Sequence, residues 1–132
     1  MAGTFQFELV TPERLLLAGE AEQVVVPGVE GDFAVLSGHA PVISTLRAGI
    51  LEITMTDAKR RVFVKKGVAE ADWERLTILA QTAIDVDEFD SQRIADELKA
   101  AEAELAEAQD DQSKLLAERL VDQLKRLQAK AA

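Results

Sequence analysis

Glycine, proline and aspartate residues divide residues 1–87 into short apolar segments, none of them long enough for a packed helix. Apolar and polar side chains alternate at 5–9 and again at 61–65, with the two-residue period of a half-buried strand. The run 24–26 consists only of β-branched valine, which favours a strand as well. Short strands with turn signals at roughly every 8–12 residues are typical of a sandwich or barrel with mainly antiparallel strands. Gly19 and Gly67 are interpreted as breaks between strands.

Beyond residue 87 the apolar period changes from that of a strand to that of a helix. Apolar side chains recur at intervals of four and three in two stripes: Ile94, Leu98, Ala101, Leu105 and Ala108, then Leu116, Leu120, Leu124 and Leu127. Asp90 or Ser91 is the expected N-cap, and the polar stretch 110–113 separates the stripes. The sequence therefore predicts an α+β protein: an antiparallel β-sandwich over 1–87, followed by an antiparallel two-helix hairpin over 88–132.

The predicted helices meet through leucine and alanine and so bury little apolar area. At about 25 cal/mol per Å², such an interface is marginally stable alone. Two behaviours stay open: a hairpin that always rests on the sandwich, and a hairpin that swings away and binds elsewhere. The first helix is mainly acidic and the second mainly basic, which favours their antiparallel pairing.

Composition argues against several classes of function. The 132 residues carry 15 Lys plus Arg against 24 Asp plus Glu, a net charge of −9, so free nucleic acid is not an expected partner. There is no Cys and a single His, so no metal site and no catalytic residue is predicted. A hydrolase built on His39 is the enzymatic alternative, without a Gly-x-Ser-x-Gly elbow to support it. No signal peptide or membrane span is expected, and Trp73 is predicted to be a packing anchor.

One continuous segment carries a specific set of motifs. It reads Val-Pro-Gly-Val-Glu-Gly-Asp at 26–32, Gly-His-Ala-Pro at 38–41 and Arg-Ala-Gly at 47–49. In this order and spacing the segment resembles the epsilon subunits of bacterial and chloroplast ATP synthases, and equally their mitochondrial counterpart, called delta. The stretches at 64–70 and 79–83 resemble later strands of that family, so the resemblance extends over the whole chain.

The resemblance implies a non-catalytic rotor subunit of the central stalk of a proton-translocating F-type ATP synthase. Members of the family bind the gamma subunit and rest on the ring of c subunits, and they couple rotation to ATP synthesis. The implied location is peripheral, on the cytoplasmic face of the inner (plasma) membrane, with membrane contact only through the complex. Carried over by position, Glu30, Asp32 and His39 are the expected contacts with the c ring and gamma.

In some members the helical hairpin regulates the enzyme by extending along gamma and inhibiting ATP hydrolysis. Lys114, Arg119, Lys125 and Arg126 are then the candidate contacts with acidic surface on the alpha/beta catalytic head. No cofactor is expected apart from weak ATP binding at the start of the first helix. There the family's nucleotide-binding pattern is matched at Asp90 and Arg93 but not at Phe89 and Ile94. A free nucleotide-sensing module that binds ATP at the hairpin is the alternative function.

Overall fold

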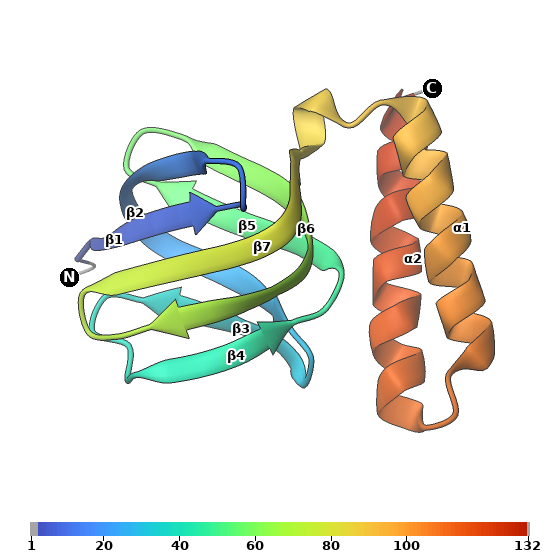
Figure 1. Cartoon of the computed structure of the whole chain (residues 1–132), viewed down its shortest axis with the longest axis horizontal. Helices are drawn as coiled ribbons and strands as arrows, with labels where there is room; N and C mark the ends of the chain where they lie inside the picture. The colour runs from blue at the N-terminus through green and yellow to red at the C-terminus, as the bar shows by residue number, and fades with distance from the viewer. Residues whose placement is uncertain (1–2, 132) are drawn as a thin grey trace. The chain divides into compact units, whose positions relative to one another are not determined.

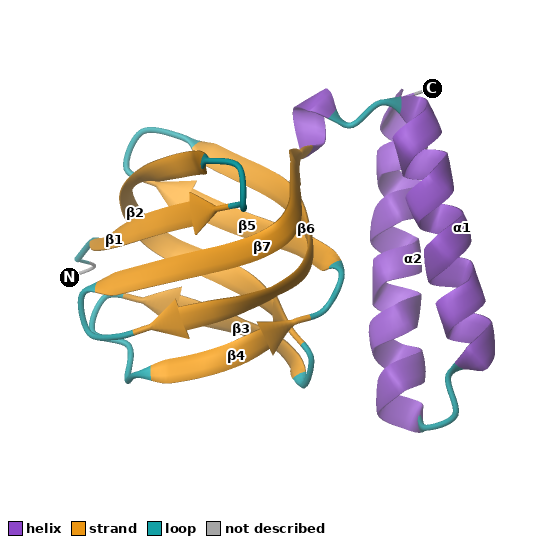
Figure 2. Cartoon of the chain, in the orientation of Figure 1, coloured by secondary structure: helices purple, strands orange, loops and turns teal. Residues whose placement is uncertain are grey.

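The computed structural model describes residues 3–131. Within them the chain forms seven strands, a 3₁₀ turn and two helices, in that order (Figures 1 and 2). The strands are β1 (Phe5–Val10), β2 (Leu15–Gly28), β3 (Gly31–Leu36), β4 (Val42–Leu46), β5 (Gly49–Met55), β6 (Lys59–Ala71) and β7 (Arg75–Asp85). The 3₁₀ turn η1 (Val86–Glu88) leads to α1 (Ser91–Glu107) and α2 (Asp111–Ala131). The expected α+β class, with strands first and helices last, is confirmed.

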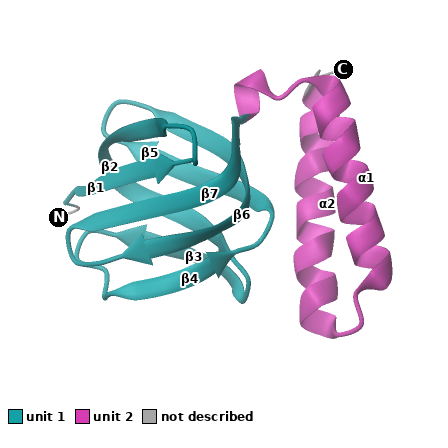
Figure 3. Cartoon of the chain, viewed as in Figure 1, with its two compact units in different colours: residues 1–85 teal, residues 86–132 magenta. Residues whose placement is uncertain are grey.

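The chain divides into two compact units, Met1–Asp85 and Val86–Ala132 (Figure 3). The boundary expected after residue 87 lies inside the 3₁₀ turn that begins the second unit. The first unit contains every strand, and the second contains both helices of the hairpin.

The strands of the first unit form two layers, and the long strands β2 and β6 each contribute to both. The first half of β2 pairs with β1, and its second half pairs with β3 and β5. Likewise β6 pairs with β5 through its first half and with β4 through its second. The pairings are antiparallel except that between β1 and β7, which is parallel. Phe7, Leu9, Leu51, Leu76 and Ile78 are fully buried in the core, as strand alternation predicts.

The predicted breaks at Gly19 and Gly67 are wrong, because β2 and β6 run through both positions. At Gly67 the reason is close approach between strands. A Cβ atom there would lie 2.0 Å from the carbonyl oxygen of Leu79 on β7, so only glycine fits. The preceding Lys66 has a φ of 56°, an uncommon left-handed conformation for a residue with a side chain. This residue lies between the part of β6 that pairs with β5 and the part that pairs with β4.

The helical hairpin follows the two predicted stripes. Ile94, Leu98 and Ala101 are buried on α1, as are Leu120, Leu124 and Leu127 on α2. An aspartate precedes each helix and caps it. The Asp90 carboxylate accepts the backbone N–H of Arg93 at 2.7 Å, and the Asp110 carboxylate accepts the backbone N–H of Ser113 at 2.7 Å and its hydroxyl at 3.0 Å. These bonds favour the ionised form and lower the pKa of Asp110.

Candidate functional site

The turn between β2 and β3 presents an apolar and an acidic side chain together. Gly28 and Gly31 face each other across the hairpin, and Gly31 adopts a φ of 131° that a residue with a Cβ rarely takes. Val29 is 44% exposed at the tip and Glu30 beside it is exposed. The backbone N–H of Val29 donates to the carbonyl of Thr45 on β4 at 3.0 Å, which anchors the tip to the neighbouring strand. The tip is therefore a fixed projection suited to contact.

Asp32 follows the same turn, but its carboxylate is held by the protein itself. The guanidinium of Arg47 donates to it, and only 21% of the Asp32 side chain and 11% of the Arg47 side chain are exposed. Arg47 also donates to the carbonyl of Ala48 at 3.2 Å, and its backbone N–H donates to the carbonyl of Pro27 at 3.0 Å. The structure thus brings Glu30 and Asp32 to one turn but gives them different surroundings.

His39 belongs to the loop at the opposite end of β3. Its backbone N–H donates to the carbonyl of Leu36 at 3.1 Å, and its ring Nδ1 donates to the carbonyl of Ala40 at 2.6 Å. The ring lies 6.5 Å from that of Phe33, measured between centroids. A six-residue strand is roughly 17–20 Å long, so the backbone of His39 is well separated from the β2–β3 turn. The three residues expected to contact the c ring and gamma therefore belong to two ends of β3.

An exposed apolar surface on the β4–β6–β7–β1 layer was not found from the sequence. Strand register aligns Thr45, Val68, Leu79 and Val10 across four neighbouring strands, and we call the three apolar residues Val68, Leu79 and Val10 the apolar row. Leu79 is 44% exposed, and Ile43, two residues before Thr45 on β4, is 73% exposed. Only the register between strands shows that these residues adjoin one another.

Polar groups border this apolar surface. The next row across the same strands reads Ile43, Glu70, Thr77 and Glu8, and Arg75 donates to Glu8 at 3.1 Å. A shallow groove lies there, with Ile43, Arg75 and Thr77 among its lining residues. An apolar centre with a polar border is the usual composition of a protein–protein contact.

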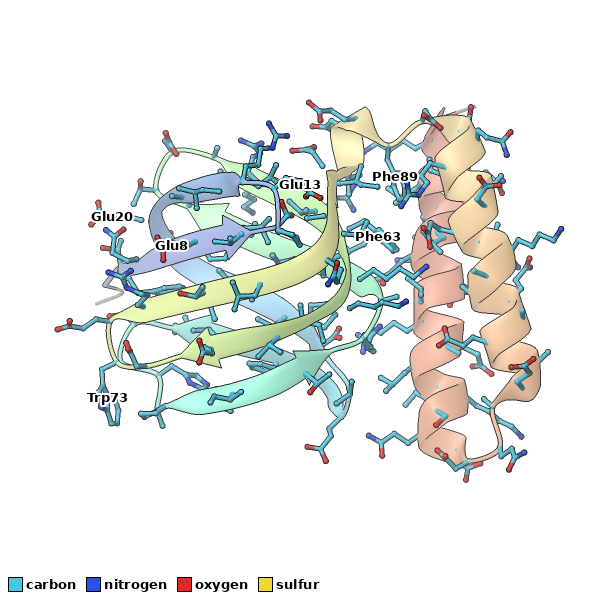
Figure 4. The ribbon with its side chains drawn as sticks, viewed as in Figure 1. Glu8, Glu13, Glu20, Phe63, Trp73 and Phe89 are labelled. Atoms are coloured by element: carbon cyan, nitrogen blue, oxygen red, sulfur yellow. The ribbon has the colours of Figure 1, made fainter. Side chains whose placement is uncertain are left out.

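Trp73 stands at the β6–β7 turn and is 60% exposed, so the prediction that it packs is wrong. Its side chain points away from the ribbon (Figure 4). The turn is shaped by Asp72, whose carboxylate accepts the backbone N–H groups of Glu74 and Arg75 at 2.9 Å each. Because the turn is held by these backbone contacts, it does not need the indole ring as an anchor.

The candidate residues of the hairpin lie on its surface. Asp90 is the N-cap of α1, and the Nε of Arg93 donates to Glu97 at 3.1 Å, so the groups expected to meet a nucleotide already have partners within the helix. The four basic candidates are exposed on α2: Lys114, Arg119, Lys125 and Arg126.

Among residues 3–131 there is no group of three or more acidic or histidine side chains placed to hold a metal ion. No helix in that range is long and apolar enough to cross a bilayer.

Comparison with known proteins gives a consistent result over the whole chain. Residues 4–86 match the family model for the β-sandwich domain of the ATP synthase delta/epsilon chain. The ATP synthase epsilon chain of Bradyrhizobium sp. (strain ORS 278) is 46% identical over 125 residues, which cover 95% of this chain and 92% of that protein. The epsilon chain of Maricaulis maris (strain MCS10) is 42% identical over 132 residues, covering 100% and 99%.

Among solved structures, a chain of the Euglena gracilis mitochondrial ATP synthase OSCP/F1/c-ring assembly superposes with a TM-score of 0.69. The match covers 98% of this chain and 82% of that one, at 21% sequence identity. At this identity the likeness concerns the fold, a strand-rich first part followed by helices.

Proposed function

The chain belongs to the ATP synthase delta/epsilon family, and from that premise we propose that it is the central-stalk subunit that couples gamma to the c ring. It is an epsilon subunit of an F-type ATP synthase, an accessory chain of the complex. In the proposed role the subunit acts by contacting other subunits and does not itself catalyse a reaction. Proton flow turns the ring, the sandwich transmits the rotation to gamma, and ATP is made in the catalytic head.

The observation that carries this proposal is the exposed apolar surface formed by the apolar row and Ile43. Leu79 and Ile43 are 44% and 73% exposed on the outer face of a sheet whose other face forms the core. Burying large apolar side chains against a partner contributes about 25 cal/mol per Å² of apolar surface removed from water, which offsets the entropic costs of association. We assign this surface to gamma, because an apolar centre with a polar border is the usual composition of a protein–protein contact.

The β2–β3 turn is the proposed contact with the c ring. Val29 supplies apolar contact at the tip, and the carboxylate of Glu30 supplies negative charge for basic groups in the loops of the ring. His39, at the far end of β3, is assigned to the contact with gamma. The subunit would then be peripheral on the cytoplasmic face of the inner membrane and would meet the membrane only through the complex.

The hairpin is the proposed regulatory part. In the inhibitory state it would leave its folded form and present Lys114, Arg119, Lys125 and Arg126 to acidic surface on the catalytic head. Charge complementarity supports this assignment, since all four basic side chains are exposed on α2.

Co-purification with gamma tests the proposal. Ile43→Glu replaces the most exposed large apolar side chain of the proposed contact with a charge, and we expect it to abolish co-purification while the chain stays folded. Leu115→Glu is the matched control, because Leu115 is 64% exposed on α2, outside the sandwich. Retention of gamma by Ile43→Glu, or loss of gamma by the control, would contradict the assignment of this surface.

A further inference from the structure

The geometry points to Arg47 as the residue that positions the β2–β3 turn, with Asp32 acting through Arg47 and not by touching the partner. This inference rests on the proposed contact of the turn with the c ring. It divides the two acidic residues of the turn into different roles: Glu30 meets the partner, and Asp32 holds the scaffold.

Burial supports a structural role for the Arg47–Asp32 pair. Only 11% of the Arg47 side chain is exposed. One terminal nitrogen donates to Asp32 and the other to the carbonyl of Ala48, whereas Nε is buried without a hydrogen-bond partner among the described residues. The carboxylate of Asp32 is thus the acidic group paired with this guanidinium. A largely buried cation whose acidic partner is removed loses much of its compensation for desolvation.

Position supports the same role, because Arg47, in the β4–β5 turn, contacts residues on both sides of the β2–β3 turn. Its backbone N–H donates to the carbonyl of Pro27, immediately before the β2–β3 turn, while its side chain reaches Asp32 immediately after it. A Cβ atom at Gly49 would lie 2.7 Å from the Pro27 side chain and 3.1 Å from the Arg47 guanidinium, so the backbone at Gly49 packs closely against both residues. The turn is held on both sides by one residue.

The arrangement fixes what charge the turn offers to a partner. The charge of Asp32 is balanced at short range by Arg47, and its side chain is 21% exposed. Glu30 is the exposed acid at the tip. Attraction between exposed charges weakens with added salt, whereas a partly buried pair is screened much less. The salt dependence of binding should therefore change when Glu30 is neutralised and should stay the same when Asp32 is neutralised.

A double-mutant cycle tests this division of roles. Full-length variants are bound to ATP synthase depleted of this subunit, and affinity is measured over a series of salt concentrations. We expect Asp32→Asn and Arg47→Met each to weaken binding roughly tenfold, and the double variant to bind no more weakly than the weaker single variant. Both single variants should keep the wild-type salt dependence, whereas Glu30→Gln should flatten it.

Two results would overturn the inference: additive losses, giving roughly a hundredfold in the double variant, or an Asp32→Asn variant that flattens the salt dependence as Glu30→Gln does. If Arg47→Met does not fold, Asp32→Asn alone still decides through its salt dependence, and Arg47→Lys, which keeps the charge, should restore part of the affinity. Failure of the wild-type chain to bind the depleted enzyme would instead refute the proposed function itself.

Discussion

Gly67→Ala should destabilise the sandwich far more than its size suggests. The added methyl group would lie 2.0 Å from the Leu79 carbonyl oxygen and 2.8 Å from the Ala80 Cα, both backbone atoms of β7 that cannot rotate away. An ordinary carbon–oxygen contact is about 3.3 Å, so β6 and β7 must separate locally by about 1.3 Å. Separation on that scale breaks the nearest hydrogen bonds of the ladder.

The cost follows from two contributions. Overpacking of a tight site costs about 1–3 kcal/mol, and two lost backbone hydrogen bonds add about 1 kcal/mol each. We therefore expect a loss of about 3–5 kcal/mol in the free energy of unfolding, a large share of the stability of an ordinary domain. Urea unfolding, followed by circular dichroism, is the assay.

Gly31→Ala is the matched control. A Cβ atom there would meet nothing within 4 Å, although its φ of 131° disfavours a side chain. That variant should lose about 1–2 kcal/mol through backbone conformation alone. If Gly67→Ala loses less than the control, close approach of β7 is not the reason for glycine in β6.

Three further predictions concern other parts of the chain. Lys66→Gly should raise the free energy of unfolding by about 0.5 kcal/mol, because relief of the left-handed φ exceeds the entropy that glycine adds to the unfolded chain; a loss in urea unfolding would contradict it. The lowered pKa of Asp110, caused by bonds from Ser113, adds stability to α2 above the ordinary aspartate range and loses it as the pH falls through the folded pKa. Asp110→Asn should therefore show a smaller acid-induced loss of helicity by circular dichroism. Finally, calorimetry should show weak ATP binding that strengthens in Glu97→Gln, because Glu97 holds Arg93; tight wild-type binding, unchanged in the variant, would be the opposite result.

The architecture was predictable because its signals are local. Two-residue alternation at 5–9 and the four-and-three spacing from Ile94 onward each depend on residues close together in the chain. Both breaks at glycine were wrong, since a glycine looks the same in sequence whether it ends a strand or allows another backbone to approach. Gly67 is explained only by Leu79, which lies on the next strand.

The candidate site was less predictable, because its contacts join distant residues. Motif resemblance indicated Glu30 and Asp32 as a pair, but their difference comes from Arg47, fifteen residues beyond Asp32. The apolar surface beside Ile43 depends on strand register, which the sequence does not encode directly. Local patterns also gave no reason for Trp73 to be exposed, since that depends on how the β6–β7 turn projects.

Proton-driven ATP synthesis in membrane vesicles depleted of this subunit tests the central claim most directly. The wild-type chain, added back, should restore synthesis, and Ile43→Glu should not, although it remains folded. Restoration by both chains would contradict a role that depends on this surface, and full synthesis in the depleted vesicles would contradict the coupling role altogether.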